Sequence, residues 1–342
     1  MTGSRRNLAS MISMSGKSPP HSVLVRRKSS RSDGGIMRIP RALRELRDVA
    51  ILSARGRVNH LFSGSMAVLR SQIRFTFGTK SQREAAAIVL IGAGTAPIVI
   101  RFKAATPSKV RIFLCSAASS SWNFAIRMDE GSTASVEFYL IGATEETAFE
   151  RSVAVTSGAS LTLATILLNG GKTTVQDRSI LTGEGGTLRS ETLGVLAFED
   201  SLEALQSVRH DAPRSVSDLV NSLIASDSAQ VVFDVTGAIA KGNAGSRCKQ
   251  QNRGVLLGER ASIEVAPKLL IDEFDVEAGH GCAIGRINSD ELFYLSSRGL
   301  DQATAKRLIV SGYTAPFAMK LNDPALRRLF EKALDAKIGG AS

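Results

Sequence analysis

The stretch DVEAGHGCAIGRINSDELFYLSSRG, Asp275 to Gly299, joins two halves of the chain that follow different sequence patterns. Before it, from 49 to 287, short apolar runs alternate with Gly, Ser, Asn and Asp. After it, from 288 to 342, apolar residues recur at helical spacing. The stretch itself holds His280 and Cys282. It therefore marks the boundary between a β region and a helical region.

The upstream runs predict half-buried strands, because several of them alternate with a period of two. Val136, Phe138 and Leu140 fall on one face of their run. Steps of the type Gly-x-Ser/Thr, such as 131–133 and 158–160, precede the next run. Few helical stretches lie between the runs, so a βαβ sheet is excluded and a sandwich, a barrel or a stacked solenoid remains. An irregular repeat of roughly 20–30 residues favours a β-helix.

Downstream, the spacing predicts three helices, over 290–298, 302–311 and 324–337. Asp301 is placed to cap the second helix, and Gly312 to end it. The third helix carries an apolar stripe at 3/4 spacing. Its residues are Leu326, Leu329, Phe330, Ala333 and Leu334. Two interpretations of the stripe stay open: it packs on the end of the β region, or it binds a partner.

The net charge of +11 is concentrated at the N-terminus. Residues 1–32 contain seven Lys or Arg and no acid, so they supply most of it. We expect 1–36 to be a disordered basic tail, because it lacks periodic apolar spacing. It is a transit peptide, sequence upstream of a true start at Met37, or a genuine tail. A short helical segment over 37–48 follows. A nucleic-acid-binding module is a rival function that rests only on this tail.

Other bulk properties exclude several classes of protein. Three widely spaced cysteines make no disulfide framework and match no C-x-x-C metal pattern, which favours a cytoplasmic location. The apolar runs are too short to span a membrane. The sequence contains no GxxxxGK[ST] loop for ATP hydrolysis. A β-helix carbohydrate-active enzyme is a further rival, but aromatic residues make up only 5% of the chain and no secretory signal is present.

The junction resembles the C-terminal signature of the SufB/SufD family, the scaffold proteins of the SUF iron–sulfur cluster assembly system. The residues that carry the resemblance are His280-Gly281, Gly285, LFYLSSRG at 292–299, Ala305, Ile309 and Gly312-Tyr313. Upstream the resemblance extends through His210, Ser217, Ser228, Phe233, Gly237, Gln251, 256–258 and 267–271. It implies a right-handed parallel β-helix over 49–287, a small C-terminal helical region over 288–342 that docks on the SufC ATPase, and no catalysis by the chain itself.

Two departures from the SufB pattern indicate the SufD-like branch. SufB-like chains carry a cysteine on a core strand where this sequence has Asn252. They also carry His-Glu at the junction, where this chain reads His280-Gly281. A shifted alignment that uses Cys248 keeps a SufB-like, cluster-bearing paralogue open as the alternative.

The resemblance also implies a site and two partners. In the SufD-like branch the histidine faces a SufB-type subunit and helps to hold a transient iron–sulfur cluster, so we predict that His280 binds the cluster and its iron. Cys282 lies on the same face of a strand and is a candidate second ligand. The alternatives are a histidine bonded to a turn carbonyl and a buried cysteine that acts as a small apolar residue. ATP-driven dimerisation of SufC would then open the site.

Further residues are assigned to partner binding or to structure. We expect Phe293, Tyr294 and Arg298 to fix the first helix on the last strand and to form a partner surface with Leu326, Leu329 and Phe330. His210 matches a family position, and we expect it to be bonded within a corner of the β region.

Overall fold

The computed structural model describes residues 49–53, 56–61, 65–68, 73–78, 85–91, 97–104, 107–115, 119–142, 145–287, 289–321 and 324–338. The predicted basic tail, 1–36, and the predicted helical segment, 37–48, lie outside these residues.

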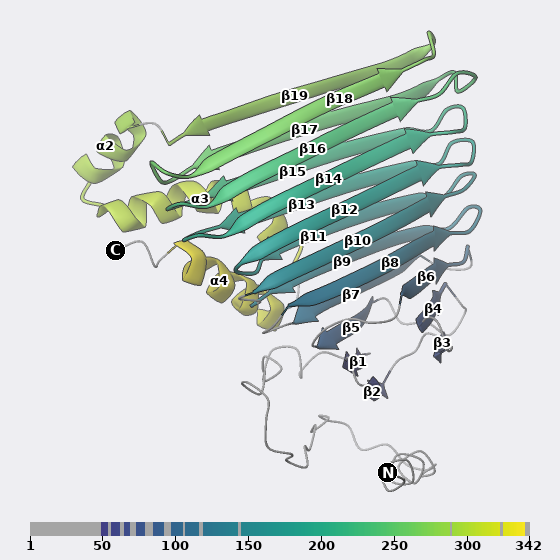
Figure 1. The fold of residues 1–342 in the computed structure, drawn as a ribbon, viewed down its shortest axis with the longest axis horizontal. Coiled ribbons are helices and arrows are strands. Elements are labelled where there is room, and N and C mark those ends of the chain that lie inside the picture. Colours follow the sequence, from purple (N-terminus) through teal and green to yellow (C-terminus); the bar gives the residue numbers. More distant parts are fainter. Residues whose placement is uncertain are drawn as a thin grey trace, which may run out of the picture.

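The described strands form two sheets (Figure 1). Sheet A has the order β19 (Val276–Arg286), β17 (Ser246–Leu256), β15 (Val216–Ala225), β13 (Thr187–Leu196), β11 (Ser160–Leu168), β9 (Thr133–Ile141), β7 (Ser108–Cys115), β5 (Ala85–Ile91), β1 (Val49–Ser53) and β2 (Gly56–Leu61). Sheet B has the order β18 (Ser262–Ile271), β16 (Gln230–Ile239), β14 (Ser201–His210), β12 (Lys172–Leu181), β10 (Glu146–Val155), β8 (Ser120–Met128), β6 (Ile98–Phe102), β4 (Ile73–Phe77) and β3 (Ser65–Val68).

The chain alternates between the two sheets, so each strand pairs with the strand two positions further along. Ser160 pairs with Thr187 and Thr187 pairs with Val216, both in parallel register. Only β1–β2 and β3–β4 are antiparallel among the described pairs. One strand from each sheet makes one rung, and Figure 1 shows the rungs stacked as a ladder. The predicted parallel β-helix is confirmed.

The core is the lumen, which we define as the space between the inner faces of the two sheets. Alternate residues of each strand are buried in it; β10, for example, alternates exposed and buried along its length. In the rungs nearest the N-terminus the lumen is filled by Phe77, Phe102, Phe124, Phe138 and Phe149, none of which is exposed. Fully burying such a side chain stabilises the fold by about 1.5–3 kcal/mol.

The predicted Gly-x-Ser/Thr steps are corners of the β-helix. Gly131, Gly158 and Gly185 have φ of +64°, +62° and +67°, a conformation that strains other residues. Their amides bond to the next corner, as in Gly131 N–H to the Ser157 carbonyl at 2.9 Å. In the following rung Arg214 takes the same conformation, with φ +53°.

The helices are α2 (Ser289–Ser297), α3 (Gln302–Ala318) and α4 (Pro324–Ile338). Asp301 caps α3 as predicted, accepting a hydrogen bond from Thr304 N–H at 2.8 Å. The predicted end at Gly312 is wrong, because α3 continues through Pro316 to Ala318. Val310 and Phe317 pack in a second apolar cluster on the outer face of sheet A, and this packing offsets the low helix propensity of Gly312.

The apolar stripe of α4 packs within the chain. Leu326 and Phe330 are each 2% exposed, and Leu329 is half-buried against the same cluster on sheet A. The prediction that these three residues bind a partner is therefore corrected: they pack on the β region, as the alternative expected, but on the outer face of sheet A and not on its end. Because helices cover its outer face, β11 is buried on both sides and reads as a nearly continuous apolar run.

Candidate functional site

The last rung of the β-helix is open. Within the described residues β19 pairs only with β17, and β18 only with β16. Every residue of β19 after Val276 is exposed. Pro267 lies inside β18, a position that a strand tolerates at an edge. The backbone edge of this rung and the mouth of the lumen are thus both accessible.

His280 and Cys282 lie at this mouth. In the parallel register His280 pairs with Gln250 and Cys282 with Asn252. Gln250 and Asn252 are each 1% exposed and face the lumen, so the residues stacked on them share that face. The prediction that His280 and Cys282 lie on one face of a strand is confirmed. The alternative of a buried Cys282 is wrong, because its strand has no neighbour on the outer side.

Beneath the mouth, buried side-chain amides link the two sheets. Asn221 Nδ2 donates to Asn252 Oδ1 at 2.9 Å and to Gln206 Oε1 at 3.0 Å. Gln206 Nε2 donates to Ser190 Oγ at 3.2 Å, and Asn252 Nδ2 to the Gly281 carbonyl at 3.4 Å. We call these four side chains, Ser190, Gln206, Asn221 and Asn252, the lumen amide chain. Sequence reasoning missed it, although polar residues at inward strand positions were its signal.

His210 is bonded within a corner, as predicted. It is fully buried, with Nδ1 2.7 Å from Ser215 Oγ and Nε2 2.8 Å from Ser217 Oγ. Burial lowers the pKa of His210 to about 4, so the ring is neutral at pH 7. Its role is to satisfy the polar groups of this corner.

The two buried cysteines have the properties of inert thiols. Burial raises the pKa of Cys115 to about 12 and also raises the pKa of Cys248. A reactive thiol needs exposure and a lowered pKa, and neither residue has them. Cys248 therefore lacks the character of a sulfur acceptor that a shifted alignment would give it.

The described residues of one chain contain no group of three or more His, Cys, Asp or Glu placed to hold a metal ion. His280 and Cys282 supply two soft donors on one face, which suits iron or an iron–sulfur cluster as cargo.

Phe293, Tyr294 and Arg298 lie on the exposed side of the helical region. Phe293 is 76% and Tyr294 56% exposed, so they do not fix α2 on the last strand as we predicted. In Figure 1 α2 lies to the side of the strand ends, away from the sheets. The Arg298 guanidinium lies over the Tyr294 ring, 5.2 Å from its centroid. An open groove of about 430 Å³ is lined by Asp290, Tyr294, Leu295 and Ile309. Phe293, Tyr294 and Arg298 stay candidates for partner binding.

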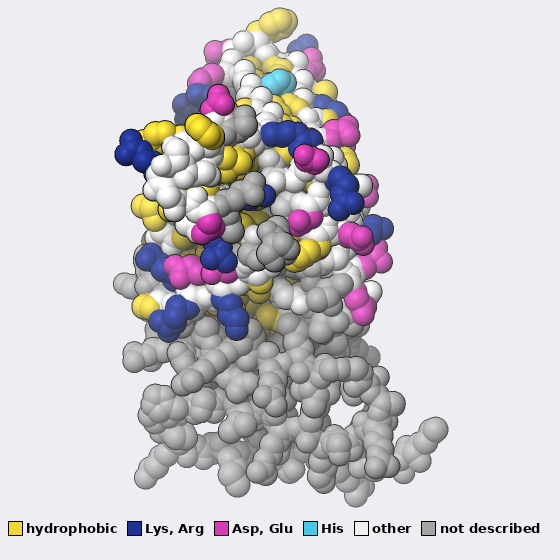
Figure 2. Space-filling model, turned by 90° about the vertical axis from the view of Figure 1, so that its left-hand side faces the viewer, with side chains coloured by type: hydrophobic (Ala, Val, Ile, Leu, Met, Phe, Trp, Pro, Cys, Tyr) yellow, Lys and Arg dark blue, Asp and Glu magenta, His cyan; other side chains and the backbone are white. Residues whose placement is uncertain are grey.

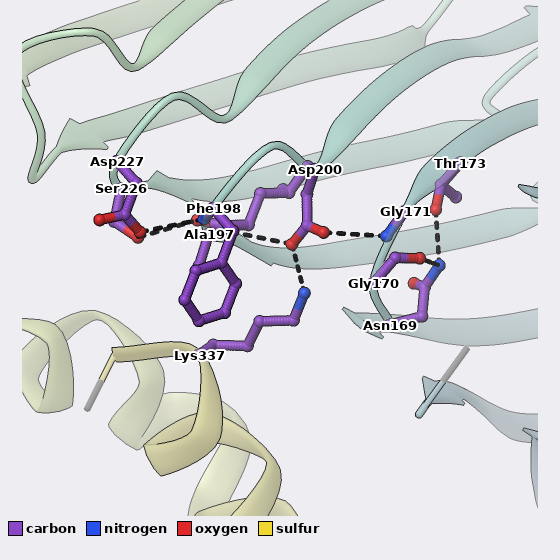
Figure 3. Close-up of polar contacts among 11 residues, drawn as sticks. Asn169, Gly170, Gly171, Thr173, Ala197, Phe198, Asp200, Ser226, Asp227 and Lys337 are labelled. Atoms are coloured by element: carbon purple, nitrogen blue, oxygen red, sulfur yellow. Dashed lines mark hydrogen bonds and ion pairs between the residues drawn. The ribbon is translucent and has the colours of Figure 1, made fainter. Parts of the chain in front are cut away.

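Two ion pairs that the sequence did not reveal attach the helical region to the β-helix. Lys337 of α4 pairs with buried Asp200, which also accepts hydrogen bonds from Ala197 N–H and Gly171 N–H at 2.9 Å each (Figure 3). Lys320 pairs with Glu191. Burial alone would raise the pKa of Glu191, but hydrogen bonds from Lys320 and Arg189 lower it. Basic and acidic side chains intermingle on the face that Figure 2 shows.

The fold and the site define a β-helix protein with an open terminal rung, a polar lumen mouth and a C-terminal helical region. A family model, the SufBD core domain of SUF system FeS cluster assembly, matches residues 99–313, more than half of the chain. This chain belongs to the SufB/SufD family.

Among the relatives that this chain resembles are two SufD proteins, which supports a SufD-like chain. It is 30% identical over 172 residues to the iron-sulfur cluster assembly protein SufD of Bacillus subtilis, covering 50% of this chain and 39% of that protein. It is 26% identical over 162 residues to SufD of Escherichia coli, covering 47% and 38%. It is 32% identical over 137 residues to the chloroplastic protein ABCI7 of Arabidopsis thaliana, covering 40% and 29%. The chain thus matches about two fifths of the length of the SufD relatives.

Proposed function

We propose that this chain takes part in iron–sulfur cluster assembly as a SufD-like scaffold subunit without catalysis of its own. It pairs with a SufB-type subunit through the open rung, and it binds the SufC ATPase through Phe293, Tyr294 and Arg298. The observation that carries the proposal is the open rung, where β19 has no strand partner on its outer side within the described residues and an imidazole and a thiol share one face. We expect a cytoplasmic location, or an organellar stroma or matrix if 1–36 is a transit peptide.

The site is half of a cluster site in this proposal. His280 and Cys282 face the lumen mouth, and a partner strand added to β19 would bring its own ligands to the same place. A site divided between subunits opens when the subunits separate, which fits the release of a cluster driven by SufC. In the family the SufB-like cysteine is on a core strand, and here that position is Asn252, buried in the lumen amide chain. A SufB-like paralogue is therefore the weaker candidate.

None of the described helices is both long and apolar enough to cross a membrane. The carbohydrate-active alternative needs a pair of carboxylates in a cleft and aromatic platforms. The lumen mouth offers neither, since its inward residues on β18 are Val265, Pro267 and Leu269.

The test is co-purification. Expressed with a SufB-type and a SufC partner under anaerobic conditions, the chain should enter a complex that contains one copy of it. His280→Ala should lower the cluster content and leave the stoichiometry unchanged. Glu277→Ala, an exposed residue on the opposite face of the same strand, is the matched control. Failure to form a complex with these partners would refute the scaffold role.

A further inference from the structure

We infer that Gln250 is the positioning residue for His280: its amide oxygen accepts the ring N–H of His280 and directs the other ring nitrogen toward the ligand. The inference rests on the proposed function only for what that ligand is. The proposed hydrogen bond between His280 and Gln250 lies within this chain and needs no partner protein.

The amide of Gln250 is oriented but only half satisfied. Its side chain is 1% exposed, and Nε2 donates to the Lys268 carbonyl on β18 at 3.1 Å. A carbonyl accepts only from the nitrogen, so this bond fixes which end of the amide is Oε1. Oε1 has no partner within the part of the chain that the structure describes. An unsatisfied buried acceptor costs about 1–3 kcal/mol, so it calls for a donor.

The fold makes room for this side chain. A Cβ at Gly237 on β16 would lie 2.4 Å from Cys248 Sγ and 3.0 Å from Gln250 Nε2. The glycine leaves room both for Cys248 and for Gln250, whose side chain crosses the lumen to β18. One rung deeper, the residue that pairs with Gln250 is Leu219, an apolar filler. In sheet A the glutamine thus occurs in the rung directly beneath the mouth and is replaced by leucine one rung deeper.

The donor in register is His280. It pairs with Gln250 on the next strand, and neighbouring strands lie about 4.7–4.9 Å apart. His280 makes no hydrogen bond to Oε1 in this structure, and its exposed ring is free to take the side-chain rotamer that would bring one N–H to it. The amide of Asn252, the next inward residue, already donates to the Gly281 carbonyl.

A neutral imidazole has one N–H and one lone pair. When the N–H is held by an acceptor, the tautomer and the direction of the lone pair are fixed, as in most histidine metal ligands. Gln250 would therefore set which nitrogen of His280 faces the cluster.

The experiment is ¹⁵N NMR of the histidine rings in the full-length chain, without iron and without partners. The chain has four histidines, and His280→Ala assigns the signal of interest. We expect one tautomer and a ring N–H of His280 that exchanges slowly with water. Gln250→Met should remove the slow exchange and mix the tautomers. Gln250→Leu repeats the test with the residue that the next rung already accommodates.

Gln251→Met is the matched control, because it removes an exposed, outward-facing amide from the same strand; it should leave the His280 signal unchanged. His210, held by two serines, is the internal reference. A rapidly exchanging His280 ring in the wild type, or an unchanged tautomer in both Gln250 variants, would overturn the inference.

These outcomes do not depend on the complex. If the ring measurements succeed and co-purification fails, Gln250 orients His280 but the scaffold role is wrong. If both succeed, Gln250→Met should lower the iron affinity of the assembled site by about tenfold or more, with assembly intact.

Discussion

The two ends of the lumen are built from different side chains. The rungs from β4 to β10 are filled by stacked phenylalanines, with Phe124 and Phe138 edge to face at 5.0 Å and Phe138 and Phe149 at 5.3 Å. The rungs from β12 to β19 hold the lumen amide chain and His210. Between them lies the buried Arg151–Asp177 pair, whose guanidinium stands 4.9 Å over the Phe138 ring.

The difference separates stability from orientation. Apolar side chains release their free energy on burial whatever direction they face, so the aromatic end needs only to be filled. The free-energy cost of removing an amide from water is offset only when its hydrogen bonds are made, and these require a defined geometry. The hydrogen-bonded amides therefore add defined positions, directly below His280 and Cys282, to rungs that apolar residues also fill.

The largest effect should come from the aromatic end. We expect Phe138→Ala to lower the free energy of unfolding by about 3–5 kcal/mol, because it leaves a cavity among packed rings. Urea unfolding followed by circular dichroism measures the change. Phe293→Ala, which removes an exposed ring from α2, is the control and should change it by less than about 0.5 kcal/mol. A similar loss in both variants would mean that the aromatic stack is not the stabilising core.

The next effect is the pH dependence that His210 gives to the amide end. In the unfolded chain the His210 imidazole binds a proton as the pH falls below about 6.5, whereas in the folded chain it does so only near pH 4. The stabilisation is complete above pH 6.5 and is lost as the pH falls to 4. The pKa difference of His210 accounts for about 3 kcal/mol of the free energy of unfolding. We expect the free energy of unfolding to fall by this much more in the wild type than in His210→Asn between pH 7 and 4.

The same measurement on the Phe138→Ala variant serves as the control, since that change leaves His210 in place and should keep the full pH dependence. Parallel pH curves for wild type and His210→Asn would show that the ring is protonated in the folded state and that the corner is solvated.

The aromatic end and the strands were accessible from the sequence, whereas the amide end was not. Period-two alternation reports which residues face inward, and it correctly placed Phe138 on a buried face. Gly131 and Gly158 marked corners because their backbone conformation excludes most other residues. Asn221 and Gln206 were not predicted, because the two residues lie on different strands and no local sequence pattern encodes a hydrogen bond between them.

The candidate site divides in the same way. The face shared by His280 and Cys282 follows from strand geometry alone, but the openness of the rung depends on what pairs with β19, which the sequence does not state. For α4 the stripe was visible in the sequence and its target was not: Leu326 and Phe330 pack on sheet A, and Lys337 pairs with Asp200 in the turn between β13 and β14.

The smallest effect tests whether the amide end acts as one unit. Asn221→Leu leaves two buried acceptors, on Asn252 and Gln206, without a donor, and should cost about 1–3 kcal/mol. Asn252→Leu removes one acceptor from Asn221 and the donor to the Gly281 carbonyl, which lies on an exposed strand where water can replace it, so it should cost less. The double variant should cost less than the sum, with a coupling energy of about 1 kcal/mol.

The contrasting cycle pairs Asn221→Leu with Phe138→Ala, at the other end of the lumen. Thr192 and Thr165 separate these two positions in the register, so their effects should add within about 0.5 kcal/mol. Coupling between the asparagines with additivity across the lumen would mean that hydrogen bonds, and not a general loosening of the rungs, transmit the effect. Additivity in both cycles would instead make each amide an independent contact, and the geometry beneath His280 would then depend on Gln250 alone.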